Sequence, residues 1–301
     1  MSHLPLNIAT CPVTWNNNDL PGWRELVPFP DVLDRMIEAG YTATEYDEKF
    51  GLEPDQVLAE TRSRGITLCG SYQWLDLLHD DVFATQIDGF RDRLALLQAL
   101  DCRNVIIADA LRPERVAMAG NVPRDGSASL ADEGYRNIAG NASRAAAIAA
   151  EYDIAAHYHN HVGTWIETPN EVDALLPHLR DAGIDLCFDT GHYAYGGGDA
   201  AAFLAEHLVD TGYLHLKDVD TEIVREARQN GWSFLDALRQ IVFAPIGSGD
   251  ANIPTILDTL VDGNFSGWVV IEQDTCAGDQ TINARKNLDF VVQYLAKRMH
   301  P

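Results

Sequence analysis

The sequence alternates eight times between a short apolar stretch and a longer segment whose apolar residues recur at helical spacing. The short stretches are rich in β-branched and other apolar residues, as β-strands are. They occupy residues 6–14, 41–47, 66–74, 104–110, 154–161, 184–189, 211–218 and 267–274. Eight strand–helix units in 301 residues predict a (β/α)₈ barrel, the TIM-barrel fold of the α/β class, as one domain over residues 1–301.

The intervening segments carry the start and stop signals of helices. Pro30 opens one segment that Gly40 closes, and Thr168 with Glu171 forms a capping box at the start of another. The alternative fold is a doubly wound sheet. No G-x-G-x-x-G motif follows the first strand, however, and the three glycines at 196–198 lack that spacing. The helix signals therefore favour the barrel.

Two connections between a strand and the next helix look unusually long. Residues 111–129 show no clear period, and residues 219–234 form the second long connection. In a barrel of this kind both would lie on the catalytic face, where lids are found. The alternative is a disordered insertion.

The charge of the chain limits its partners. Asp and Glu number 45 against 22 Lys and Arg, a formal net charge of −23. Nucleic acids and anionic membranes are therefore disfavoured, and a neutral or metal-chelated small molecule is favoured. We expect neither a secretory signal nor a membrane span, because no apolar run is long enough. Five cysteines without a C-x-x-C motif suggest reduced thiols in a cytoplasmic protein.

Polar and titratable residues follow nearly every predicted strand. In a (β/α)₈ barrel the carboxyl ends of the strands form the active site. Buried charges there cost several kcal/mol unless they are paired or bind a ligand. A purely structural barrel would not need so many of them, so the pattern predicts a catalytic or binding site at that end.

The stretch His157–His161, "HYHNH", raises the question of a metal site. Alternate residues of a strand share one face. One imidazole or carboxylate from each of four consecutive strands then points into the barrel: His159, Asp189, His215 and Glu272. Two nitrogens and two oxygens suit one divalent ion, Mn²⁺ or Co²⁺ first and Zn²⁺ as a further possibility. The alternative is a hydrogen-bonded polar core.

Several motifs resemble a known family. The runs F-D-T-G-H-x-x-x-x-G-G-D, L-H-L-K-D and W-x-V-I-E resemble the sugar-phosphate isomerase/epimerase superfamily of xylose isomerase-like TIM barrels. Three further runs, T-W-N-N-N-D-L-P, T-E-Y-D-E-K-F and H-x-H-V-G-T, resemble the inosose dehydratases of inositol catabolism. The resemblance implies a barrel, a divalent metal and proton transfer next to a carbonyl group.

The resemblance also bears on the type of reaction. In the isomerase and epimerase branches, glutamates on strands five and eight both ligate the metal and move protons. Here Glu272 takes the strand-eight position, but His159 takes the strand-five position. The matched pair of carboxylates is lost, which favours a one-way elimination. Asp189 and His215 match the other two ligand positions, and His192 matches the histidine beside the metal.

The resemblance therefore implies a lyase that dehydrates a keto-polyol of the inosose type, such as 2-keto-myo-inositol. The expected base is Lys49 or Glu45, which match the strand-two end of the dehydratases. The expected general acid is His161 or His192. Both pairs of alternatives stay open from the sequence.

Six further side chains are expected to contact the substrate: Trp15, Asn17, Asp19, Tyr72, Trp74 and Lys217. The aromatic residues could face the apolar edges of a ring, although such residues are more often part of a core. Asn17 and Asp19 could bind ring hydroxyls or could simply form a turn after the first strand.

Other functions remain open. A ketose isomerase or epimerase acting on a keto-sugar would exchange substrate hydrogen without loss of water. A repair nuclease would need a basic face, which the charge disfavours. A sugar- or metal-binding protein would bind without turnover. A homo-oligomer is compatible with all of these readings.

Overall fold

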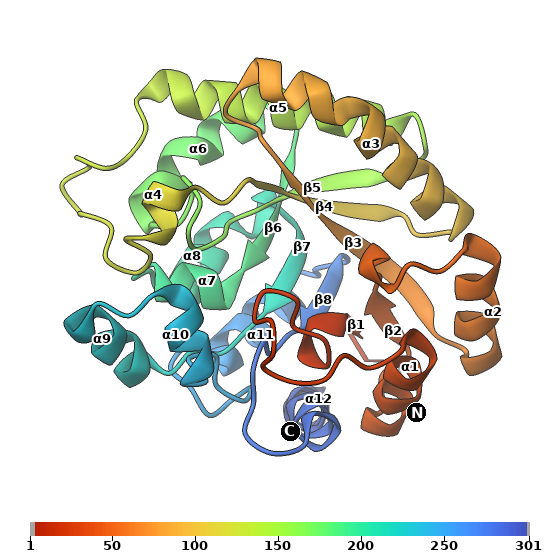
Figure 1. Cartoon of the computed structure of the whole chain (residues 1–301). Coiled ribbons are helices and arrows are strands. Elements are labelled where there is room, and N and C mark those ends of the chain that lie inside the picture. The colour runs from red at the N-terminus through yellow and green to blue at the C-terminus, as the bar shows by residue number, and fades with distance from the viewer. Residues whose placement is uncertain (1–3, 300–301) are drawn as a thin grey trace.

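The computed structural model describes residues 4–299, so the ends of the expected domain, 1–3 and 300–301, lie outside the described residues. Eight parallel strands close into a barrel in chain order, with β8 pairing β1 (Figure 1). The expected TIM barrel is confirmed. The strands are β1 (Asn7–Thr10), β2 (Ala43–Glu45), β3 (Thr67–Leu75), β4 (Asn104–Asp109), β5 (Ala155–His159), β6 (Asp185–Asp189), β7 (Thr211–Leu216) and β8 (Trp268–Ile271).

Most strands end earlier than the sequence predicts. Strand β5 stops at His159 and β8 at Ile271, so His161 and Asp274 lie in the connections that follow. The backbone N–H of His161 donates to Ile166 O, which folds residues 161–166 into a turn. Polar residues after a strand therefore form the rim of the barrel instead of extending its hydrogen-bonded ladder.

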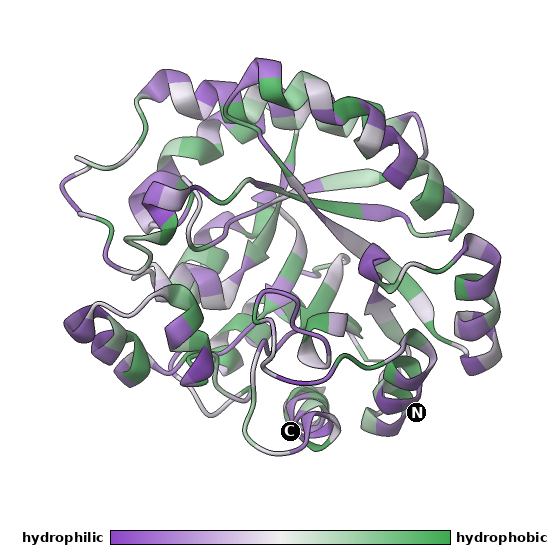
Figure 2. Ribbon diagram, in the orientation of Figure 1, coloured by the Kyte–Doolittle hydropathy of each residue, from purple (hydrophilic) through white to green (hydrophobic). Residues whose placement is uncertain are grey.

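Helices surround the barrel and turn their apolar faces toward it (Figure 2). They are α1 (Phe29–Ala39), α2 (Pro54–Arg64), α3 (Asp80–Ala99), α4 (Pro113–Val116), α5 (Asp132–Ala150), α6 (Pro169–Ala182), α7 (Thr190–Tyr195), α8 (Ala200–His207), α9 (Thr221–Asn230), α10 (Phe234–Arg239), α11 (Ile253–Asp262) and α12 (Gln280–Met299). Short 3₁₀ turns occupy Pro12–Thr14, Glu48–Phe50 and Leu208–Asp210. None of the helices in residues 4–299 is both long and apolar enough to cross a membrane.

The predicted signals mark the observed helix ends. Gly40 ends α1 in the left-handed conformation at φ 100°, which a residue with a side chain adopts only with strain. At the start of α6 the carboxylate of Glu171 accepts a hydrogen bond from the backbone N–H of Thr168 at 2.9 Å, as a capping box requires.

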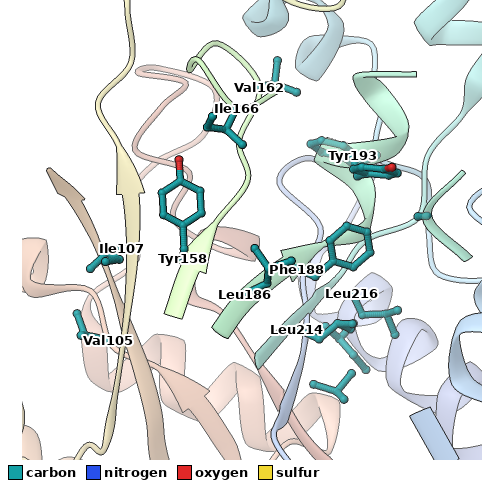
Figure 3. Close-up of a cluster of buried hydrophobic side chains, with 14 of the residues drawn as sticks. Val105, Ile107, Tyr158, Val162, Ile166, Leu186, Phe188, Tyr193, Leu214 and Leu216 are labelled. Carbon is teal, nitrogen blue, oxygen red and sulfur yellow. The ribbon is translucent and has the colours of Figure 1, made fainter. Parts of the chain in front are cut away.

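Side chains alternate between the helices and the lumen along each strand. Figure 3 shows Val105, Ile107, Leu214 and Leu216 in the apolar layer between strands and helices. A second, smaller cluster fills the barrel: Ala9, Ala43, Cys69, Ile106, Cys187, Tyr213 and Val270. This parity leaves residues two positions further along, such as Asp189 and His215, facing inward above the lumen cluster.

The two long connections differ from one another. Residues 111–129 are mostly irregular apart from α4, as the sequence predicts. Residues 219–234, expected as a loop, are mainly the helix α9. The carboxylate of Asp220 caps this helix by accepting from the N–H groups of Glu222 and Ile223, and Gly231 ends it at φ 63°. The segment is polar overall, but its few apolar residues recur at helical spacing and bury Val224 and Ala227.

Candidate metal centre and active site

The carboxyl ends of the strands surround a cavity. Its walls come from the connection after β1, the ends of β2, β3, β7 and β8, the connection after β5, and α7. Most of the predicted site residues line it, namely Asp19, Glu45, Lys49, Tyr72, Trp74, His159, His161, His192, His215, Lys217 and Glu272. Asp189 is fully buried at the end of β6, in contact with His159 and His215.

Donor atoms of the four predicted metal ligands converge in this cavity. Nε2 of His159 lies 3.2 Å from Nδ1 of His215 and 3.4 Å from Oδ2 of Asp189. Nδ1 of His215 lies 3.1 Å from Oε2 of Glu272 and 3.7 Å from Oδ2 of Asp189. Donor atoms that share one small divalent ion at about 2.1 Å are separated by roughly 3–3.5 Å. The spacing therefore fits one ion.

Unsatisfied atoms at the point of convergence fit the same interpretation. Oδ2 of Asp189 and Oε2 of Glu272 are buried and have no hydrogen-bond partner among the described residues. Buried carboxylate oxygens of this kind need a cation to offset their desolvation. Asp189, His215 and Glu272 also form one of the groups whose donor atoms all lie within 4.8 Å of one another. The chemistry of this donor set fits a divalent cation.

Hydrogen bonds behind the two histidines set which nitrogen faces the centre. Oε1 of Glu45 accepts from Nε2 of His215 at 2.9 Å and from the Tyr213 hydroxyl at 3.0 Å. With Nε2 protonated, Nδ1 of His215 presents its lone pair to the centre. The Tyr72 hydroxyl lies 3.3 Å from Nδ1 of His159 and holds that ring in the same manner. Glu45, expected as a base, is placed to position a ligand.

Lys217 lies at the floor of the cavity among carboxylates. Its Nζ is 3.0 Å from Oδ1 of Asp274, 3.3 Å from Oε1 of Glu272 and 3.4 Å from Oδ2 of Asp189. Phe243 covers it, with Nζ 4.9 Å from the ring centroid. Burial opposes the charged form, but the charges of Asp189, Asp274 and Glu272 outweigh it and raise the pKa of Lys217 well above its ordinary value, so the ammonium group stays charged.

Asp274 is absent from the predicted set although it lines the cavity. Burial, then the charge of nearby Glu272, raises the pKa of this carboxyl to about 7, against the opposing effect of Lys217. Its position two residues after Glu272 is the sequence signal that could have identified it. Arg93 also lines the cavity from α3, where nothing in a charged helical segment distinguishes it from a surface arginine.

His161 and His192 form a stacked pair in the cavity wall. Their ring centroids are 3.8 Å apart at an interplanar angle of 39°. Nδ1 of His161 donates to Val162 O at 2.6 Å, which leaves the lone pair on Nε2. Burial, then the neighbouring His159, lowers the pKa of His161 to about 3, and burial also lowers the pKa of His192. Both rings are therefore neutral near pH 7, so neither carries the proton expected of a general acid.

Two predicted substrate contacts do not reach the cavity. Trp15 is buried and donates from Nε1 to the Thr281 hydroxyl at 3.1 Å, so it belongs to the packing between the β1 connection and α12. Asn17 forms a turn, with Oδ1 accepting from the N–H of Asp19 at 2.9 Å and Nδ2 donating to Asp274 O at 3.0 Å. Asp19 and Lys49 are exposed at the mouth. Trp15 is therefore a core residue and Asn17 a turn residue, the alternatives to substrate contact that the sequence also offered.

Comparisons with known proteins agree with this architecture. The sequence profile of the family described as xylose isomerase-like TIM barrel matches residues 33–294. The rhizopine catabolism protein MocC of Rhizobium meliloti is 29% identical over 91% of this chain and 83% of its own length. An inosose dehydratase of Geobacillus kaustophilus is 27% identical over 90% of this chain and 88% of its own length.

Solved structures share the fold at low sequence identity. The probable 3-DHS dehydratase AsbF from Bacillus anthracis superimposes with a TM-score of 0.72 at 13% identity, covering 95% of this chain and 98% of its own. The IOLI protein, solved with a binding zinc atom, gives 0.72 at 13% identity over 97% and 99% of the two chains. An L-ribulose 3-epimerase gives 0.72 at 13% identity over 98% and 96%.

Proposed function

The chain belongs to the family of xylose isomerase-like TIM barrels, and from this we propose that it is a metal-dependent lyase that dehydrates a keto-polyol of the inosose type. The observation that carries the proposal is the convergence of four side chains from the carboxyl ends of β5 to β8, two imidazoles and two carboxylates. The relatives named inosose dehydratase, which cover most of the chain, support the substrate class.

His159, Asp189, His215 and Glu272 would hold the ion. A divalent ion in this place would act as a Lewis acid that polarises a ketone and acidifies the neighbouring C–H group. Mixed nitrogen and oxygen ligands suit Mn²⁺ or Co²⁺, with Zn²⁺ as the further candidate. The zinc atom in the IOLI structure supports a metal of this class.

His161 is the base that the geometry favours. Its Nε2 carries a lone pair, and its low pKa leaves it unprotonated near neutral pH. In the proposed reaction Nε2 of His161 takes the proton from the carbon next to the ketone. Lys49 at the mouth stays as the alternative base from the sequence, whereas Glu45 is engaged by His215 and Tyr213.

Lys217 would complete the elimination as the general acid. The C–O bond to the β-hydroxyl breaks, and Nζ of Lys217 supplies the proton with which that oxygen leaves as water. The carboxylates of Glu272 and Asp274 hold Nζ in place. The proton that His161 takes would return to Lys217 by way of the stacked His192, whose Nε2 lies 3.3 Å from Nζ.

The direct test is to strip the protein of metal, reload it with Mn²⁺, Co²⁺ or Zn²⁺, and offer 2-keto-myo-inositol. Appearance of the ultraviolet absorption of an enolisable dione, with loss of water, is expected. Absence of product with each of the three metals would overturn the proposal. Incorporation of solvent deuterium without dehydration would instead indicate an epimerase or isomerase.

A further inference from the structure

A second cleft lies on the same side of the molecule and shares no lining residue with the cavity of the proposed metal centre. Four segments form it: the connection between β4 and α5, the start of α6, the turn after α7, and α9. In Figure 1 the β4–α5 connection runs beside α4 and comes down toward α9. A hydrogen bond from Arg228 to Gly120 O, at 2.7 Å, joins α9 to this connection.

Two arginines, Arg124 and Arg228, converge on one backbone position in this cleft. A Cβ atom on Gly197 would lie 3.1 Å from Nη2 of Arg124 and 3.4 Å from Nη2 of Arg228. Gly197 also has a φ of 98°, a conformation that side chains disfavour. The glycine therefore permits two guanidinium groups from distant segments to approach the same point.

Neither guanidinium has an anionic partner within ion-pair distance in residues 4–299. Arg228 donates from Nε to Gly120 O and from Nη2 to Tyr195 O, both neutral carbonyls. Arg124 is exposed and makes no side-chain hydrogen bond to the rest of the described chain. By contrast, the buried Arg115 pairs directly with the carboxylate of Glu171.

The surroundings leave this positive charge uncompensated. Burial, then the charge of Arg124, lowers the pKa of Arg228, so the second cation is held there at an electrostatic cost. The carboxylate of Glu167 is a weaker opposing influence, and its two oxygens already accept from the N–H groups of Gly120 and Gly163. In a chain of net charge −23, two adjacent unpaired cations facing a cleft are unexpected.

We propose that this cleft binds a phosphate-bearing small molecule, with the phosphate seated between Arg124 and Arg228 over Gly197. A phosphate monoester carries close to two negative charges near pH 7 and three acceptor oxygens, which match two guanidinium groups. A single carboxylate would neutralise only one of them. The volume of the cleft leaves room for the remainder of the ligand beside Asn121, Asn170 and Val122.

Arg228 contacts the carbonyl of Tyr195, the last residue of α7, and α7 also carries His192 of the first cavity. The phosphate site therefore adjoins the outer end of a helix whose inner side lines the proposed active site. The proposal of a phosphate site does not depend on the proposed dehydratase activity.

The test measures binding of inorganic phosphate to the metal-loaded protein by titration calorimetry at low ionic strength. Arg124→Ala removes one cation that makes no hydrogen bond or ion pair within residues 4–299, and Arg225→Ala removes an exposed charge from α9 as a matched control. We expect phosphate binding to weaken at least about tenfold in R124A, partly recover in R124K, and stay unchanged in R225A. Acetate, a monoanion, should bind far more weakly than phosphate.

Equal phosphate affinity in R124A and the wild type would overturn the proposal, as would no binding of phosphate to the wild type at millimolar concentration. Glycerol 3-phosphate and glycerol then form a second pair of probes. Binding of glycerol 3-phosphate that weakens in R124A, together with no binding of glycerol, supports a phosphorylated metabolite as the ligand. Equal binding of glycerol 3-phosphate and of glycerol, in R124A as in the wild type, would contradict this ligand class.

Discussion

Oε1 of Glu45 on β2 accepts a hydrogen bond from Nε2 of His215 on β7 at 2.9 Å, across the width of the barrel. The bond fixes the tautomer of His215, whose other nitrogen faces the proposed ion. Histidine ligands in proteins commonly have such a carboxylate partner, and its loss costs about 10–100-fold in metal affinity. This contact gives the strand-two carboxylate a positioning role.

Glu45→Ala should therefore weaken metal binding about 10–100-fold while a metal-saturated sample keeps much of its turnover. Glu45→Gln should restore part of the affinity, because its amide oxygen can still accept from His215. Metal titrations of both variants, followed by kcat at saturating metal, provide the measurement. A base role would give the opposite pattern, with normal metal binding and equal inactivity in both variants.

Removing one proposed ligand should remove the ion. His159→Ala deletes one donor from a set of four, and Glu272→Gln replaces a charged donor by a neutral amide, so both proteins should lose most bound metal after dialysis. Elemental analysis of the dialysed proteins is the measurement, with Cys11→Ser at the cavity wall as the control for an uninvolved lining residue. If both variants keep a full equivalent of metal, the ligand set is wrong.

Lys217→Met should lower kcat about 10²–10⁴-fold, the usual effect of losing a general acid. Metal content should stay near that of the wild type, because no ligand is deleted. Turnover by rapid mixing and elemental analysis on the same samples separate the two effects. Near-normal turnover in this variant would assign the acid to another residue.

The buried carboxyl group of Glu167 should make the stability of the fold depend on pH. Burial raises the pKa of its carboxyl from the ordinary 4.5 to about 7 in the folded protein. Between those values the folded state binds more protons than the unfolded state. The contribution of this group to the free energy of unfolding therefore decreases as pH rises from 4.5 to 7, by up to about 1.4 kcal/mol per pH unit.

Glu167→Gln removes this titration. Urea unfolding of the wild type and the variant at pH 5, 6, 7 and 8 should show a difference that changes in favour of the variant as pH rises. Other titrating groups are common to both proteins and cancel in the difference. Parallel pH profiles would show that Glu167 is ionised in the fold throughout this range.

The buried ion pair between Arg115 and Glu171 anchors the long connection after β4. Nη2 of Arg115 lies 2.9 Å from Oε2 of Glu171, and neither side chain is exposed. Arg115→Met leaves a buried carboxylate without its partner and should cost about 3–5 kcal/mol of unfolding free energy. Arg136→Met breaks an exposed pair with Asp132 and should cost less than about 1 kcal/mol. Equal effects in chemical denaturation would contradict the burial argument.

The sequence by itself determined the barrel and the face that each strand residue takes. A period of two in β5 and β7 turns His159 and His215 inward, and parallel strands bring their carboxyl ends to one rim. Those two regularities are local, since they depend only on the order of residues within a strand and on the repeat of strand and helix.

Only the tertiary structure decided what each inward residue touches. Glu45 and His215 are 170 positions apart, and no periodicity relates them, so a positioning role could not be separated from a catalytic one. The same holds for Lys217, whose carboxylate partners come from the end of β6 and from the connection after β8. From the sequence, Trp15 could equally be an aromatic substrate contact or a core residue. Its hydrogen bond to Thr281 of α12, which only the folded chain brings near, identifies it as a core residue. Protonation follows burial and neighbouring charges, which are properties of the folded chain.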